Sequence, residues 1–165
     1  FTQELAPYEE ADPFEAVKRA FQLIAMARTS TSALEARKMG FLRDGDRISM
    51  NRDFLIADAK RRVLELAPDY RPPLPPRIRV LGSEALGNLR YAVWSFREAG
   101  EMTDHDMKIG LEIAYVLSGG EGPAREVSEW DLLDLEREAF LKLLGTRKTQ
   151  ERIAYTLKTG KPLRN

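Results

Sequence analysis

The feature that constrains the fold most is the C-terminal stretch 128–165, because two complete helix signals follow one another there. Ser128 is a favourable N-terminal cap and Gly145 a favourable terminator for the first helix. The apolar side chains between them recur at the spacing of one helix face: Leu132, Leu135, Phe140 and Leu143. Thr146 can cap a second helix, which Gly160 ends. Two consecutive helices are therefore predicted at this end of the chain.

The same combination of caps, periodic apolar residues and terminators occurs along most of the sequence. It predicts helices at about residues 13–27, 32–40, 51–67, 83–99 and 103–118. The segment 77–81 is too short to anchor a sheet alone, and 121–127 is predicted to be a loop. The fold class that follows is all-α, with about six to seven helices.

A proline-rich stretch divides the chain. Residues 71–76 contain four of the nine prolines. Because proline fixes φ and lacks an N–H group, this stretch is predicted to be an extended connector. A stiff spacer is the favoured interpretation, and a ligand for an aromatic-lined groove is the alternative. The predicted parts are a helical segment 1–70, the Pro-rich connector 71–82 and a C-terminal helical lobe 83–165.

The composition excludes several classes of partner. The chain has 165 residues, of which 26 are basic and 26 acidic, so its net charge gives no reason to expect nucleic acid as a partner. It has no cysteine, which excludes disulfides and thiolate metal sites and fits a reducing setting. No apolar run approaches the roughly 20 residues that cross a bilayer. We therefore expect a cytoplasmic protein without a membrane span.

The residue types that most often carry catalysis do not form a recognisable set. His105, the only histidine, lies between two aspartates in the first turn of a predicted helix, without partners at the spacing that a catalytic base or a metal requires. A solvated or helix-capping histidine is the favoured interpretation. Neighbouring carboxylates, such as Asp131 and Asp134 or Glu136 and Glu138, are typical of any helical surface. The sequence therefore predicts neither catalytic residues nor metal ligands within this chain.

Basic side chains gather on and after the last predicted helix: Arg147, Lys148, Arg152, Lys158, Lys161 and Arg164. Such a cluster of ammonium and guanidinium groups can hold phosphates. The alternative is that Lys158 and Lys161 are placed there because the helix dipole favours cations near its C-terminus. The residues alone leave both interpretations open.

Two stretches of the sequence carry a family resemblance. The first includes the runs Leu135-Glu136-Arg137-Glu138-Ala139-Phe140, Glu151-Arg152-Ile153-Ala154-Tyr155 and Lys158-Thr159-Gly160-Lys161-Pro162, and the second is the run 30–42, Ser-Thr-Ser-Ala-Leu-Glu-Ala-Arg-Lys-Met-Gly-Phe-Leu. Together they resemble the C-terminal part of the crotonase (enoyl-CoA hydratase/isomerase) superfamily. The run 46–53 and the ending 160–165 look closest to one branch, the bacterial multifunctional 3-hydroxyacyl-CoA dehydrogenase/enoyl-CoA hydratases of fatty-acid β-oxidation.

The resemblance implies that this chain is the helical C-terminal part of a crotonase-like domain, and that a longer polypeptide precedes Phe1. In crotonases the turns that form the oxyanion hole and carry the catalytic glutamates come before the part seen here. The implied parent enzyme hydrates trans-2-enoyl-CoA and has an NAD-dependent dehydrogenase elsewhere, so a CoA thioester and NAD are its implied ligands. The matching crotonase helix end lies over CoA, which implies Arg152, Lys158 and Lys161 as contacts to a CoA phosphate.

On this basis we expect the chain alone to be inactive. Its implied work is to cover the acyl-CoA site and to make helix contacts with the remainder of the parent chain or with another subunit. Apolar helix faces without their sheet would be left uncovered, so we also expect a homo-oligomer, with self-association or swapped helices in the isolated chain. The alternative is a free-standing all-α interaction module, which docks through an exposed apolar helix face and the proline connector.

Overall fold

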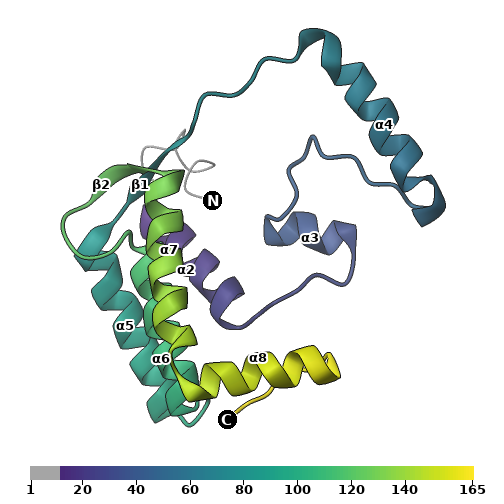
Figure 1. The fold of residues 1–165 in the computed structure, drawn as a ribbon. Helices are drawn as coiled ribbons and strands as arrows, with labels where there is room; N and C mark the ends of the chain where they lie inside the picture. The colour runs from purple at the N-terminus through teal and green to yellow at the C-terminus, as the bar shows by residue number, and fades with distance from the viewer. Residues whose placement is uncertain (1–11) are drawn as a thin grey trace. The chain divides into compact units, whose positions relative to one another are not determined.

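The computed structural model describes residues 12–165 (Figure 1). The helices and strands follow in this order: α2 (Pro13–Ala25), α3 (Ala33–Met39), α4 (Leu55–Leu66), β1 (Arg77–Val80), α5 (Gly82–Glu98), α6 (Asp104–Leu117), β2 (Arg125–Ser128), α7 (Glu129–Leu144) and α8 (Arg147–Thr159). Short 3₁₀ turns at Arg52–Phe54 and Ala67–Asp69 flank α4. Within the described residues the fold is mostly helical, which confirms the predicted fold class.

Contacts divide these elements into two units. The larger unit consists of residues 12–28 and 76–165, and the smaller unit of residues 29–75. The division differs from the predicted one, which placed residues 13–27 with the segment up to residue 70. The reason is that the apolar face of α2 packs on α5 and α6, which lie far along the chain. A local sequence pattern shows that a helix has an apolar face but does not show which partner covers it.

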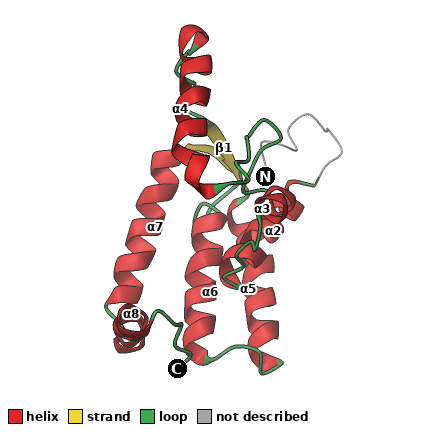
Figure 2. Ribbon diagram, turned by 90° about the vertical axis from the view of Figure 1, so that its right-hand side faces the viewer, coloured by secondary structure: helices red, strands yellow, loops and turns green. Residues whose placement is uncertain are grey.

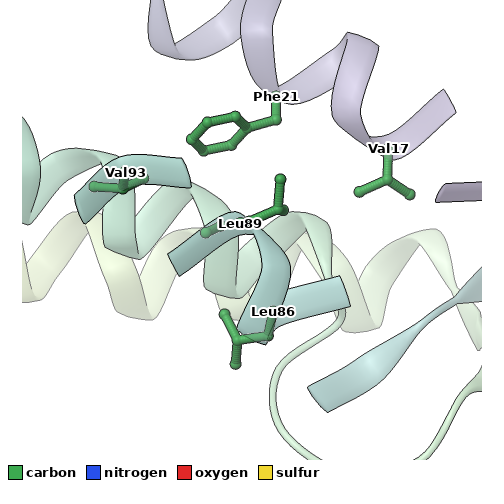
Figure 3. Packing of buried hydrophobic residues seen from close by; sticks show 6 residues of the cluster. Val17, Phe21, Leu86, Leu89 and Val93 are labelled. Atoms are coloured by element: carbon green, nitrogen blue, oxygen red, sulfur yellow. The ribbon is translucent and has the colours of Figure 1, made fainter. Parts of the chain in front are cut away.

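The core of the larger unit lies where α2 packs against α5 and α6. Leu86, Leu89 and Val93 of α5 are at most 1% exposed. Val17 and Phe21 of α2 belong to the same cluster, and Figure 3 shows the side chain of Leu89 pointing toward them. Steps of three and four residues place the α5 row on one side of the helix. The apolar face predicted for residues 83–99 is therefore the one that folding buries.

Strands β1 and β2, which are yellow in Figure 2, pair antiparallel. The pairing places Ile78 opposite Val127. The prediction of a loop over 121–127 is wrong at its C-terminal end, because residues 125–127 belong to β2. The segment 77–81, too short to form a sheet alone, obtains its hydrogen-bond partner from this distant strand. Such pairing depends on tertiary structure, and four-residue strands carry little signal of their own.

Gly119 allows the end of α6 to approach β1. Its φ is +75°, in the left-handed region, and a Cβ atom at this position would lie 2.5 Å from the Cβ of Val80. Glycine is the residue type that meets both conditions without strain or a clash.

The two C-terminal helices begin and end close to the predicted positions. Ser128 caps α7 in a reciprocal pair with Asp131: its hydroxyl accepts from the Asp131 N–H, and the Asp131 carboxylate accepts from the Ser128 N–H at 2.7 Å. Gly160, with φ +68°, ends α8 in the left-handed conformation. Thr146 precedes α8, but its side chain caps no backbone N–H; the hydroxyl lies 2.6 Å from the Leu143 carbonyl oxygen instead.

The smaller unit has little core of its own. Ser32 caps α3 and Gly40 ends it with φ +83°, at the predicted limits of this helix. The helix predicted from residue 51 begins later, because Asn51 caps the 3₁₀ turn Arg52–Phe54 and α4 starts at Leu55. Ala36 is the one hydrophobic residue of segment 29–75 that is buried, and no residue of α4 is buried. The apolar side chains of this unit therefore remain largely exposed to solvent. Among residues 12–165, no helix combines the length and apolarity that crossing a membrane would demand.

Candidate functional site

The side chains predicted to bind phosphate, Arg152, Lys158 and Lys161, have different surroundings in the structure. Arg152 turns toward the start of α6, where its Nη1 donates to Asp106 Oδ1 at 2.7 Å and its Nε donates to Asn165 Oδ1 at 2.8 Å. The side chains of Arg152 and Asp106 are each only 19% exposed. Arg164 lies at the same carboxylate, with Nη2 3.8 Å from Asp106 Oδ2. Arg152 thus fastens α8 and the last residue of the chain to α6.

The two lysines of the predicted phosphate site lie elsewhere. Lys158 is in the last turn of α8, about 9 Å along the helix axis from Arg152 at 1.5 Å per residue, and Lys161 follows the end of the helix. Both are exposed, and neither ammonium group has an ion-pair partner within residues 12–165. Arg147, at the other end of α8, pairs with Glu151 at 2.8 Å. The structure therefore leaves Lys158 and Lys161 as the accessible cations at this helix end.

Burial and hydrogen bonding oppose each other at Asp106. Burial alone would raise the pKa of the carboxyl group, but hydrogen bonds from Arg152 and Thr103 outweigh it, and the pKa is lowered. Thr103 donates its N–H and its hydroxyl to Asp106 Oδ2, at 3.0 and 2.9 Å. Thr103 and Asp106 therefore cap the start of α6 reciprocally, and the same carboxylate also anchors Arg152.

His105 is buried between α6 and α8, and the prediction of a solvated or capping histidine is wrong. It is 5% exposed, and its Nε2 lies 2.9 Å from Thr149 Oγ1. Burial lowers the pKa of the imidazole, and the positive charges of Arg152, Lys148 and Lys108 lower it further. The pattern of residues 104–106 gave no sign of this, because the covering residue comes from a helix 44 positions later.

The direction of each hydrogen bond around His105 follows from the one acceptor that cannot donate, a carbonyl oxygen. Thr146 Oγ1 lies 2.6 Å from the Leu143 carbonyl oxygen and 2.9 Å from Thr149 Oγ1. A carbonyl can only accept, so Thr146 must donate to it, and Thr149 must then donate to Thr146. All contacts are satisfied only if His105 donates from Nε2 to Thr149. The neutral Nε2–H tautomer completes the chain of hydrogen bonds.

An apolar groove lies on the larger unit where α2 and α7 both pack on α6, with a volume of about 520 Å³. Most of its lining is aliphatic or aromatic: Ala16, Val17, Ala20, Ile24, Ile78, Val80, Ile113, Val116, Leu117, Leu132, Leu133, Ala139, Phe140 and Leu143. Charged lining residues are Arg79 and three glutamates, of which Glu112 pairs with Lys142 while Glu129 and Glu136 lie on α7. Such a surface can accept apolar groups flanked by positive charge. Sequence periodicity identified the α7 face but not this groove.

Residues 12–165 contain no group of three or more histidine and carboxylate side chains arranged to hold a metal ion.

No family model matches the chain, and no solved structure matches it. A protein of Bacillus subtilis (strain 168) described as a probable 3-hydroxyacyl-CoA dehydrogenase is 42% identical to it over 156 residues. The chain resembles part of that dehydrogenase. The aligned region covers 93% of this chain and 20% of the relative, so the chain spans about a fifth of the relative's length. The dehydrogenase half of the expected resemblance is thereby supported, whereas the comparisons give no support for the enoyl-CoA hydratase half.

Proposed function

We propose that this chain is part of a fatty-acid β-oxidation enzyme that contains an NAD-dependent 3-hydroxyacyl-CoA dehydrogenase coupled to an enoyl-CoA hydratase. The observation that carries the dehydrogenase assignment is the 42% identity to the Bacillus subtilis protein, which extends over 93% of this chain. The hydratase assignment rests on the crotonase resemblance of residues 30–42 and 135–162. Both activities would reside in the remainder of the polypeptide, in the cytoplasm.

Within that enzyme, this chain would cover the acyl-CoA site and make helix contacts with neighbouring parts or subunits. The accessible ammonium groups of Lys158 and Lys161 would contact a CoA phosphate. Arg152 was expected to share this role, but its bonds to Asp106 and Asn165 suit it better to holding α8 in position for the two lysines. Lysine binds phosphate as a point charge, without the fixed geometry that a guanidinium requires.

The test begins with the longer polypeptide that includes this sequence. It should reduce NAD with 3-hydroxyacyl-CoA and hydrate trans-2-enoyl-CoA, whereas the 165-residue chain alone should do neither. Replacing Lys158 and Lys161 together by Ala should raise the KM for acyl-CoA and leave kcat nearly unchanged, because the lost contact is with the carrier and not with the reacting atoms. The matched control is Arg147→Ala, which removes a cation at the other end of α8.

Two results would count against the proposal. Turnover by the 165-residue chain alone would remove the non-catalytic role, and a longer polypeptide without NAD reduction on 3-hydroxyacyl-CoA would remove the dehydrogenase assignment.

A second candidate function is a free-standing helical interaction module. It is favoured by one observation, that no residue of α4 is buried. If this were the whole function, neither 3-hydroxyacyl-CoA nor NAD would raise the melting temperature of any polypeptide that contains these residues.

A further inference from the structure

Helix α4 has a one-sided apolar surface that the smaller unit does not cover. The stripe consists of Leu55, Ile56, Ala59, Val63 and Leu66. With 3.6 residues per turn, these positions fall within about a third of the helix circumference. Ile56 is 84% exposed and Val63 is 64% exposed. A helix of this kind is stabilised mainly by packing its apolar face, so the stripe needs a complementary surface.

The groove of the larger unit has the length of such a helix. Its α7 wall runs from Glu129 to Leu143, which is roughly 21 Å at 1.5 Å per residue, and the 12 residues of α4 span about 18 Å. Its edges are open to water, since Ile24 and Phe140 are each 52% exposed. A small ligand would keep much of its surface in water there, unlike a ligand in an ordinary binding pocket. An amphipathic helix keeps its polar side in water in any case, so it suits an open groove better.

The charges beside the two surfaces are complementary. By helical position, Lys60 and Arg62 border the apolar stripe of α4 on its two sides. Lys60 has no ion-pair partner among the described residues, whereas Arg62 also pairs with Glu65 of the same helix at 3.4 Å. In the groove, Glu129 and Glu136 are exposed, and within the described part of the chain neither has an ion-pair partner. A basic border facing an acidic rim favours association and fixes its register.

We propose that two copies of this chain form a dimer in which α4 of each copy lies in the groove of the other. The exchange is reciprocal, so a single two-fold arrangement covers both α4 stripes and both grooves and closes on itself. The dimer goes beyond the enzymatic role proposed above and does not depend on acyl-CoA chemistry.

Sedimentation equilibrium of the 165-residue chain over a wide concentration range tests the α4 side. The wild-type chain should be a dimer, and Val63→Glu should weaken dimerisation at least about 100-fold, because it removes one apolar side chain from each of two contacts. Leu64→Glu is the matched control: Leu64 is 63% exposed, next to Val63, and outside the stripe. This control should leave the dimer intact.

The groove side has its own pair of variants. Phe140→Lys should disrupt the dimer, whereas Leu141→Lys should not, since Leu141 is 58% exposed on the same helix but does not line the groove. In a mixture, the Val63→Glu chain still has an intact groove and the Phe140→Lys chain an intact α4. The mixture should therefore form a heterodimer through one contact, which two misfolded variants could not do.

Three results would overturn the dimer. One is a wild-type chain that stays monomeric at every concentration. Another is a dimer that Phe140→Lys disrupts and Val63→Glu does not, which would mean that the groove binds something other than α4. The third is a mixture of the two variants without a heterodimer.

Discussion

The ion pair between Asp106 and Arg152 should contribute more to stability than an exposed ion pair of the same length. Its nitrogen and oxygen are 2.7 Å apart, and each side chain is 19% exposed. The pair of Arg97 and Asp104 has the same separation of 2.7 Å, but its side chains are 38% and 80% exposed. Because water screens the second pair more strongly, equal distances should give unequal coupling free energies. The chain thus provides its own control for the effect of burial.

The perturbation is a double-mutant cycle with Asp106→Asn, Arg152→Gln and the double variant. For the partly buried pair we expect a coupling free energy of about 2 kcal/mol, between the values of up to about 1 kcal/mol for exposed pairs and 3–5 kcal/mol for breaking fully buried ones. The cycle cancels the separate contribution of Asp106 to capping α6. For the cycle of Asp104→Asn and Arg97→Gln, we expect less than about 1 kcal/mol.

The assay is urea unfolding followed by circular dichroism, at low and at high salt. Added salt should reduce the coupling of the exposed pair by the larger fraction, since buried pairs are screened less. Equal coupling free energies in the two cycles would refute the reasoning that burial sets the strength of this contact.

Three further predictions concern the larger unit. Burial lowers the pKa of His105 below its ordinary 6.5. The stabilisation that the neutral imidazole provides should therefore be complete above about pH 6.5 and should decline as the pH falls toward the folded-state pKa. In His105→Gln, the unfolding free energy plotted against pH should lose the slope that this titration causes. Gly119→Ala should cost about 2–4 kcal/mol in urea unfolding, because it combines a left-handed φ with a clash, whereas Gly100→Ala, at φ +76° with open space around it, should cost only about 1 kcal/mol. Leu89→Ala should cost about 2–5 kcal/mol by the same measurement, since this side chain is 1% exposed, and a smaller loss would mean that the core can collapse around the gap.

The sequence predicted the helices well, because the signals that begin and end them are local. Ser32, Asn51 and Ser128 cap the elements that follow them, and Gly40 and Gly160 end helices in the left-handed conformation. Each signal acts over three or four residues through a hydrogen bond or a φ angle that the residue type itself favours. It therefore does not depend on the rest of the fold.

The candidate sites were less predictable, because their partners lie far apart in the sequence. Arg152 was recognised as a cation, but its bond to Asp106 spans 46 positions. His105 was expected to be solvated because the helix that covers it comes much later in the chain. The type of a residue indicates which groups its side chain can bind, but the packing of distant segments determines which of these groups lies within hydrogen-bond distance.

The sequence by itself therefore determined the helical class, the order and limits of most helices, and which face of each is apolar. Tertiary structure decided that α2 joins α5 and α6, that two four-residue strands pair, and that α2 and α7 leave a groove on α6. The physical reason is range: caps and helical periodicity act within a few residues, whereas burial and ion pairing depend on segments that only folding brings into contact.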